Sequence, residues 1–207
     1  WKSATDAALS GMQGQHIGAL ISPMLGCEDA WHLARLVKSI DPNAVLAIGP
    51  VPIDGQDKTF PGGYTLRAEK APNARGVRRV LESFTDEVLD ATAFEELLTS
   101  GGGPSSLLLT GNYPSAWVTE SLERALGDRF VVLLDTMPNR LEERADVFLP
   151  AATWMEKSGT FENVDGRLQA FERAIDPIDY CKSEAQVALD LLAGLDGSKP
   201  EWVNAIM

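Results

Sequence analysis

Short runs of apolar residues alternate along this chain with longer segments in which apolar residues recur at helical spacing. The short runs predict buried strands, and the longer segments predict helices. The clearest helix opens at Glu28 and Asp29 and carries an apolar stripe at three- and four-residue steps: Ala30, Leu33, Ala34, Val37 and Ile40. The predicted strands are 16–22, 44–48, 106–109, 130–134 and 146–149, and the further predicted helices are 73–83, 86–99, one after Ser115, 139–144 and one that ends at Gly194. This alternation predicts an α/β fold with a layered, mostly parallel sheet and flanking helices.

Side chains able to cap helices mark several of the expected helix starts. Ser115 can cap the helix that follows the third strand, and Thr92 with Glu95 has the spacing of a capping box. The same spacing in Ser183 and Gln186 predicts the start of the closing helix.

The hydrophobic pattern is lost between residues 49 and 75. Prolines and glycines interrupt this segment throughout, and no period of two or 3.6 survives. Long irregular segments in compact domains are usually functional or pack on another domain. We therefore expect one α/β domain over residues 1–207, with a Pro/Gly-rich surface excursion at 49–75 that serves as a contact surface.

The charge and composition exclude several classes of partner. The chain has a formal net charge of −12, whereas nucleic acids and anionic membranes are bound through basic patches. No apolar run approaches the roughly 20 residues that span a bilayer. The sequence begins at Trp1 without a signal-peptide pattern or an initiator Met, which predicts a piece of a longer cytoplasmic protein.

Residues for redox, hydrolytic or metal chemistry are not found in a recognisable pattern. Cys27 and Cys181 are the only cysteines, too few for the four thiolates of an iron–sulfur cluster, and they give no disulfide framework. His16 and His32 are the only histidines, and no nucleophile elbow or His-Glu-x-x-His motif accompanies them. We therefore predict no catalytic residue and no metal ligand in this chain.

Polar residues do follow three of the predicted strands. Asn112 lies in the turn after the strand at 106–109, Asp135 directly follows Leu134, and Lys157 comes after the strand at 146–149. In open α/β sheets nucleotides bind at the carboxyl ends of the strands, where an acid can accept hydrogen bonds from ribose. Two structural alternatives remain open: Asp135 capping the next short helix, and Lys157 pairing with Glu156 or Glu162 at the surface.

Several segments resemble the molybdopterin oxidoreductase family. Residues 144–163 (RADVFLPAATWMEKSGTFEN) and 165–169 (DGRLQ) match a specific signature of that family. Residues 111–114 (GNYP) are similar to its GENP turn, and residues 22–36 are similar to a segment near the start of the same fold. Within the family, 57–63 and 71–76 resemble the branch formed by the large iron–sulfur subunits of bacterial NADH–quinone oxidoreductases.

The resemblance implies a function and a vestigial site. In molybdenum-bearing relatives the positions that match Asn112, Asp135 and Lys157 contact the guanosine end of the pterin cofactor. In the NADH–quinone oxidoreductase branch this domain serves as a scaffold without metal, so we expect no cofactor here and iron–sulfur clusters in other domains of the subunit. The implied partners are those cluster-bearing domains and other subunits of a respiratory complex, on the cytoplasmic side and peripheral to the inner membrane.

Two other functions compete with the scaffold. The chain could be a fragment of a molybdenum enzyme of the formate dehydrogenase or nitrate reductase type that grips molybdopterin guanine dinucleotide. It could also be a free-standing nucleotide-binding module.

Overall fold

The computed structural model describes residues 1–178, 180–200 and 202. Its centre is a five-stranded sheet in the order β2-β1-β5-β6-β7, in which every neighbouring pair is parallel. The strands are β1 (Ile17–Ile21), β2 (Val45–Ile48), β5 (Ser106–Thr110), β6 (Phe130–Asp135) and β7 (Val147–Pro150). All five predicted strands are therefore present, and the α/β class with a mostly parallel sheet is confirmed.

The register of the sheet aligns one row of apolar side chains across all five strands. Ala47 pairs with Leu20, Leu20 with Leu109, Leu109 with Leu133, and Leu133 with Phe148. Neighbouring rows face the opposite side, so the sheet contributes to two separate core clusters. The strands are continuous apolar runs because both faces of the sheet are covered.

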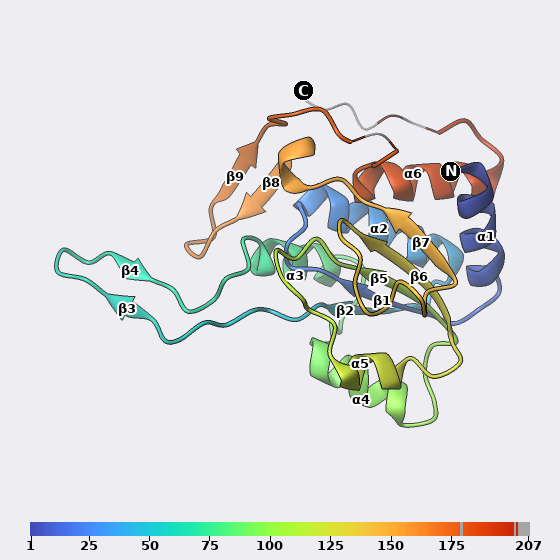
Figure 1. Ribbon diagram of the computed structural model, residues 1–207, viewed down its shortest axis with the longest axis horizontal. Coiled ribbons are helices and arrows are strands. Elements are labelled where there is room, and N and C mark those ends of the chain that lie inside the picture. The colour runs from blue at the N-terminus through green and yellow to red at the C-terminus, as the bar shows by residue number, and fades with distance from the viewer. Residues whose placement is uncertain (179, 201, 203–207) are drawn as a thin grey trace.

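Helices cover the two faces (Figure 1). One core cluster joins the sheet to α1 (Lys2–Met12), α2 (Cys27–Ile40), α3 (Ala74–Glu82) and α6 (Glu184–Asp196). The other joins it to α4 (Ala91–Thr99) and α5 (Glu120–Ala125). No helix in the described part of the chain is both long and apolar enough to cross a membrane.

Several helix ends differ from the prediction. Asp90, not a residue near 86 or Thr92, caps α4 by accepting from the backbone N–H of Ala93 at 2.8 Å. Thr119 rather than Ser115 caps α5, because residues 115–118 form no helix and the side chains of Trp117 and Val118 are buried in the core. The segment predicted as a helix at 139–144 forms turns.

The start of α6 is as predicted, since Ser183 accepts from the backbone N–H of Gln186 at 3.1 Å. The helix passes through Gly194 and ends at Asp196, followed by Gly197 in the left-handed region. Helix α1 was not predicted, because only Ala8, Leu9 and Met12 bury their side chains along it.

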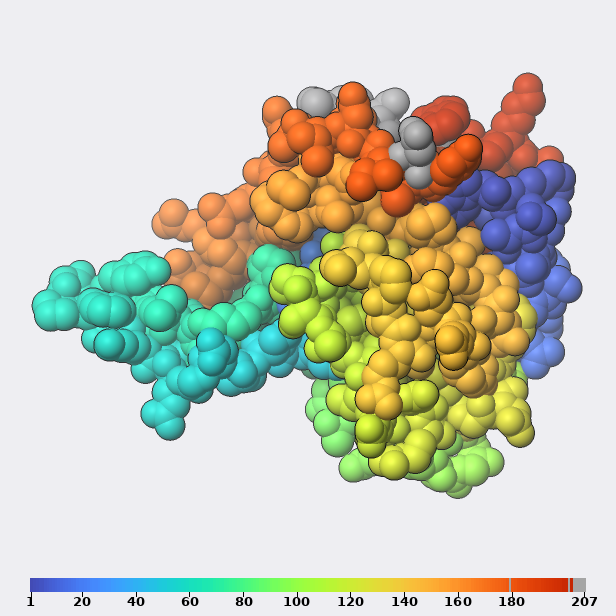
Figure 2. Space-filling model, viewed as in Figure 1, coloured from blue at the N-terminus to red at the C-terminus, as the bar shows by residue number. Residues whose placement is uncertain are grey.

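The excursion predicted at 49–75 contains an ordered antiparallel ribbon. Its strands are β3 (Lys58–Thr59) and β4 (Thr65–Leu66), and a further bridge joins Ile53 and Glu69 nearer the body. We call residues 50–72 the arm. The arm projects well beyond the layered body in Figures 1 and 2.

A second hairpin follows the sheet. The 3-10 helix η1 (Trp154–Glu156) leads into β8 (Gly159–Glu162), which pairs antiparallel with β9 (Leu168–Phe171). Strand β8 packs against α2 and α3. This hairpin and the arm extend toward the same side in Figure 1.

Candidate functional site

The turn after β5 places Asn112 beside the end of β6. Asn112 adopts a left-handed backbone conformation with φ of 71°. Gly111 before it has no room for a side chain, because a Cβ there would lie 2.0 Å from Oδ2 of Asp135. The close approach of this turn to Asp135 thus depends on glycine.

Asp135 is 3% exposed and accepts hydrogen bonds from four internal donors. Its Oδ1 accepts from the backbone N–H groups of Asn112 at 2.8 Å and Thr136 at 2.7 Å. Its Oδ2 accepts from Nε1 of Trp117 at 2.9 Å and Nδ2 of Asn139 at 2.7 Å. A carboxylate has about four lone-pair sites, so this one is fully satisfied by the protein.

The side chain of Asn112 points from the β5 turn to other elements. Its Nδ2 donates to the backbone oxygen of Ala152 at 2.9 Å and to Oε1 of Glu184 at 3.0 Å. Glu184 is the first residue of α6, which follows Asn112 by more than seventy positions in the chain. The amide therefore ties the β5 turn to the start of α6.

Lys157 is buried between two carboxylates and is only 5% exposed. Its Nζ lies 3.0 Å from Oδ2 of Asp29 and also forms an ion pair with Oε2 of Glu184. Asp29 lies in the first turn of α2, and its Oδ1 accepts from the backbone N–H of Ala185 at 3.0 Å. The ammonium group thus joins the N-terminal turns of α2 and α6.

The shared ammonium also decides how these groups titrate. Burial lowers the pKa of Lys157, but the attraction of Asp29 and Glu184 outweighs burial and raises that pKa above its ordinary value. Burial raises the pKa of Glu184. The positive charge of Lys157 lowers this pKa and the negative charge of Asp29 raises it, and the net shift is upward. Both pKa values are raised because two buried acids share one ammonium group.

The structure therefore brings the three predicted residues into one connected network. Asp135 binds the backbone of Asn112, whose side chain binds Glu184, which pairs with Lys157. Sequence reasoning missed Glu184, and it used Asp29 only to mark the start of a helix. Both residues lie in the first turn of a helix, where the helix dipole favours an acid even without a partner.

Lys157 pairs with neither of the surface glutamates considered for it. Glu156 instead accepts from the backbone N–H groups of Thr153 and Ile178, each at 2.8 Å. Glu162 is buried and pairs with Arg79 at 2.9 Å.

Two hollows lie near the network. The smaller, of about 200 Å³, is walled by Tyr113, Trp117, Asp135, Met137 and Arg140 at the carboxyl ends of β5 and β6. The larger, of about 450 Å³, lies between the starts of α2 and α6, the β8–β9 hairpin and the segment up to Ser183. The larger hollow borders Lys157 but is not lined by Asp135 or Asn112.

The predicted residues, as arranged, do not fit a guanosine end. The carboxylate of Asp135 that would accept from the ligand already holds four protein donors. Both hydrogens of the Asn112 amide have partners, and Lys157 is sequestered by its two acids. The hollow beside Asp135 is also smaller than the roughly 300–1,000 Å³ of ordinary small-molecule pockets.

The described residues also show no centre for metal or thiol chemistry. They contain no group of three or more His, Cys, Asp and Glu side chains placed to hold a metal ion. Burial raises the pKa of both thiols, Cys27 and Cys181, which keeps them protonated and weakly nucleophilic.

Comparison with known proteins gives one family and several partial relatives. The family model for molybdopterin oxidoreductases matches residues 89–193, which is just over half of the chain. The G subunit of the NADH-quinone oxidoreductase of Streptomyces coelicolor is 39% identical over 95 residues, which cover 45% of this chain and 10% of that protein. A nitrate reductase of Symbiobacterium thermophilum is 34% identical over 71 residues, covering 34% of this chain and 9% of the relative.

A third relative extends the range of activities. The alpha subunit of the F420-dependent formate dehydrogenase of Methanocaldococcus jannaschii is 44% identical over 48 residues, covering 23% of this chain and 7% of that protein. The matched stretches thus span a tenth or less of the length of these three relatives.

Proposed function

The chain belongs to the molybdopterin oxidoreductase family, and from this premise we propose that it is a structural domain of an NADH–quinone oxidoreductase electron-transfer subunit. In this role it holds no redox centre of its own. It packs against cluster-bearing domains of the same subunit and against other subunits of a respiratory complex, on the cytoplasmic side and peripheral to the inner membrane. The similarity to two NADH-quinone oxidoreductase G subunits beyond the Streptomyces protein, at 39% and 40% identity over about a quarter of this chain, supports this assignment.

The proposal rests on one observation: the carboxylate of Asp135 accepts hydrogen bonds from four donors of the protein itself. A nucleotide-binding acid at a strand end must keep at least one oxygen available to its ligand. Here Trp117 and Asn139 take Oδ2, and two backbone N–H groups take Oδ1. A ligand would have to displace these donors and leave some of them buried without partners, at about 1–3 kcal/mol each.

Thermal unfolding with and without millimolar GDP tests the proposal, with ADP as the control nucleotide. We expect no GDP-selective rise in melting temperature. A ligand that binds only the folded state at 100 times its dissociation constant would add about 2.7 kcal/mol. For a domain of this size that is roughly 5–10 °C, well above the error of the measurement.

A GDP-selective rise would contradict the scaffold role if it depends on the strand-end residues. The shift is measured for Asp135→Ala and for the exposed control Asp128→Ala, each against its own melting temperature without ligand. Loss of the rise in Asp135→Ala alone would show that a guanosine pocket survives.

One observation favours a second function, a pterin-dinucleotide-binding fragment of a molybdenum oxidoreductase. The smaller hollow lies beside Asp135 at the sheet edge where α/β folds bind nucleotides, and the exposed residues Met137 and Arg140 form part of its rim. Rotation of Asn139 away from Asp135 would free one acceptor position on Oδ2, which Trp117 would still share. The GDP experiment separates the two functions, because only the second requires guanine-selective binding.

A further inference from the structure

The arm is an ordered ribbon with a fixed register. Near the body, the backbone N–H of Asp54 donates to Ala68 at 2.8 Å. At the outer end, the N–H of Phe60 donates to the oxygen of Tyr64 at 2.8 Å, and the two glycines between them, 62 and 63, have positive φ. The register between these points pairs Lys58 with Leu66.

This register gives the outer arm two faces of different chemistry. On one face, Thr59 and Thr65 approach to 2.9 Å between their hydroxyls, and Asp57 pairs with Arg67 at 2.7 Å. The polar groups of this face therefore satisfy one another. Because side chains alternate along strands, the opposite face carries the remaining residues, Lys58, Phe60, Tyr64 and Leu66.

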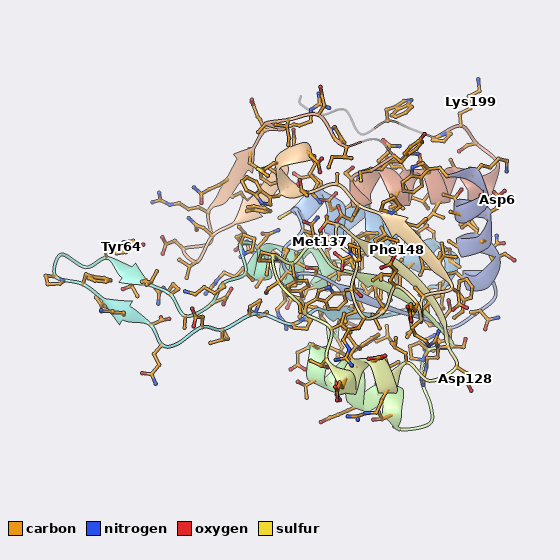
Figure 3. The ribbon with its side chains drawn as sticks, in the orientation of Figure 1. Asp6, Tyr64, Asp128, Met137, Phe148 and Lys199 are labelled. Carbon is orange, nitrogen blue, oxygen red and sulfur yellow. The ribbon has the colours of Figure 1, made fainter. Side chains whose placement is uncertain are left out.

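The second face, which we call the aromatic face, is not covered by the body. Tyr64 is 67% exposed, Leu66 47% and Phe60 39%. The ring centroids of Phe60 and Tyr64 lie 6.1 Å apart, and Nζ of Lys58 lies 5.1 Å from the Phe60 ring. Figure 3 shows Tyr64 at the outer end of the arm, away from the layered body.

A ribbon of this kind gains little stability on its own. An isolated two-stranded hairpin is marginal in water, and aromatic residues are enriched where proteins contact one another. The strand edges of the ribbon also offer backbone groups that another protein can pair or cover. These properties favour an arm that is buried against a partner.

Charge identifies the kind of partner. The arm segment 53–70 holds three acids (Asp54, Asp57, Glu69) and three bases (Lys58, Arg67, Lys70), so it is neutral in a chain of net charge −12. Within the described part of the chain, Lys58 makes a ring contact but no ion pair. A second copy would bring another strongly acidic body, which opposes self-association.

As a deepening of the scaffold role proposed above, on which it rests, we propose that the arm docks its aromatic face in an apolar groove of a different protein subunit. A carboxylate at the rim of that groove pairs with Lys58. Phe60, Tyr64 and Leu66 fill the apolar part of the groove. The face is too small for a stable complex by itself, so the arm anchors part of a larger interface, as buried aromatic residues do in other protein interfaces.

Site-specific photo-crosslinking in the host cell tests this proposal on the protein in its natural setting. A benzophenone amino acid replaces Tyr64 on the aromatic face or, as the matched control, Thr59 on the polar face of the same ribbon. We expect one covalent product with a different polypeptide from position 64, at a yield about tenfold above that from position 59, because only the first side chain is buried in the groove. Peptide mapping of the product is expected to place an Asp or Glu of the partner next to the apolar cross-linked residues.

Charge variants in the Tyr64 probe protein complete the test. Lys58→Glu is expected to lower the yield several-fold by opposing the partner's carboxylate, whereas Lys58→Arg retains it. Equal yields from positions 59 and 64, cross-links to a second copy of this chain, or cross-links to lipid would overturn the proposal. The GDP experiment does not involve the arm, so a failure of the docking proposal is distinguishable from a failure of the scaffold function.

Discussion

The backbone N–H of Asn112 donates to Oδ1 of Asp135 over 2.8 Å, and this hydrogen bond joins the carboxyl ends of β5 and β6. In an open α/β fold that edge is the usual place for a ligand. Here a backbone group of the protein occupies one position a ligand would take. The side chain of the same asparagine donates to Glu184, so this end of the sheet is also joined to α6.

Asp135→Asn is expected to lower the free energy of unfolding by about 2–4 kcal/mol, because the new amide group would face buried donors that the carboxylate now accepts from. Trp117 and Asn139 both donate to Oδ2, and an Asn side chain offers a single acceptor oxygen for four donors. For a chain of this size the loss corresponds to about 2–4 °C per kcal/mol in melting temperature. Circular dichroism melting curves measure it.

The matched control is Asp128→Asn on an exposed turn, expected within about 0.5 kcal/mol of the parent. If Asp135→Asn is as stable as this control, the four hydrogen bonds do not stabilise the fold and the sheet edge is free to bind a ligand.

The sheet could be predicted from the sequence because each strand is a short apolar run that no helix period explains. The same logic placed Asn112, Asp135 and Lys157 near one another, since residues after parallel strands meet at one edge. Their partners could not be predicted. Lys157 pairs with Asp29, which lies 128 positions earlier in the chain, and no local spacing connects the two.

The irregular segments show the same limit. The segment at 49–75 has no period because its paired strands are only two residues long, too short to leave a pattern. At α5, both Ser115 and Thr119 satisfy the local rules for a cap. The choice of Thr119 follows from Trp117, which must reach Asp135 and therefore cannot lie in the helix.

Gly111→Ala is expected to destabilise the fold by about 2–4 kcal/mol through overpacking and displacement of a hydrogen-bonded carboxylate. The added Cβ would lie 2.0 Å from Oδ2 and 2.1 Å from Cγ of Asp135. Gly102→Ala is the control, because nothing lies within 4 Å of a Cβ there. Urea unfolding compares the two, and the double variant Gly111→Ala with Asp135→Ala should cost less than the sum of its parts because the clash is removed.

Lys157→Met is expected to cost about 3–5 kcal/mol, because it leaves two buried carboxylates without their cation. Asp29 and Glu184 each have side chains 5% exposed or less. Adding Asp29→Asn and Glu184→Gln to Lys157→Met should recover most of the loss, since the triple variant leaves no charge in this cluster. Denaturant unfolding of the three proteins measures both effects.

Lys199→Met is the exposed counterpart of this series and should change stability by no more than about 0.5 kcal/mol (Figure 3). A triple variant less stable than Lys157→Met alone would show that the lost hydrogen bonds, rather than the unpaired charges, dominate the energetics of the cluster.

Glu156 is expected to make stability fall in acid. Burial raises its pKa, but hydrogen bonds from Thr153 and Ile178 and the nearby charge of Lys157 lower it below its ordinary value overall. A carboxyl with a lowered folded pKa stabilises the fold above its unfolded pKa of about 4.3, and this contribution is lost as pH falls through the folded pKa. Glu156→Gln should therefore be less stable than the parent near neutral pH, and the gap should narrow below about pH 4.

Urea unfolding of parent and variant at several pH values measures that gap, with Glu142→Gln as the exposed control, whose gap should stay near zero throughout. A stability difference that narrows in acid would show that the charge of Glu156 stabilises the fold, because Gln keeps the size of the side chain and one acceptor oxygen. A gap that stays constant into acid would mean that Glu156 acts by packing and hydrogen-bond geometry alone, and that the lowered pKa contributes nothing to the stability of the turn that carries Lys157.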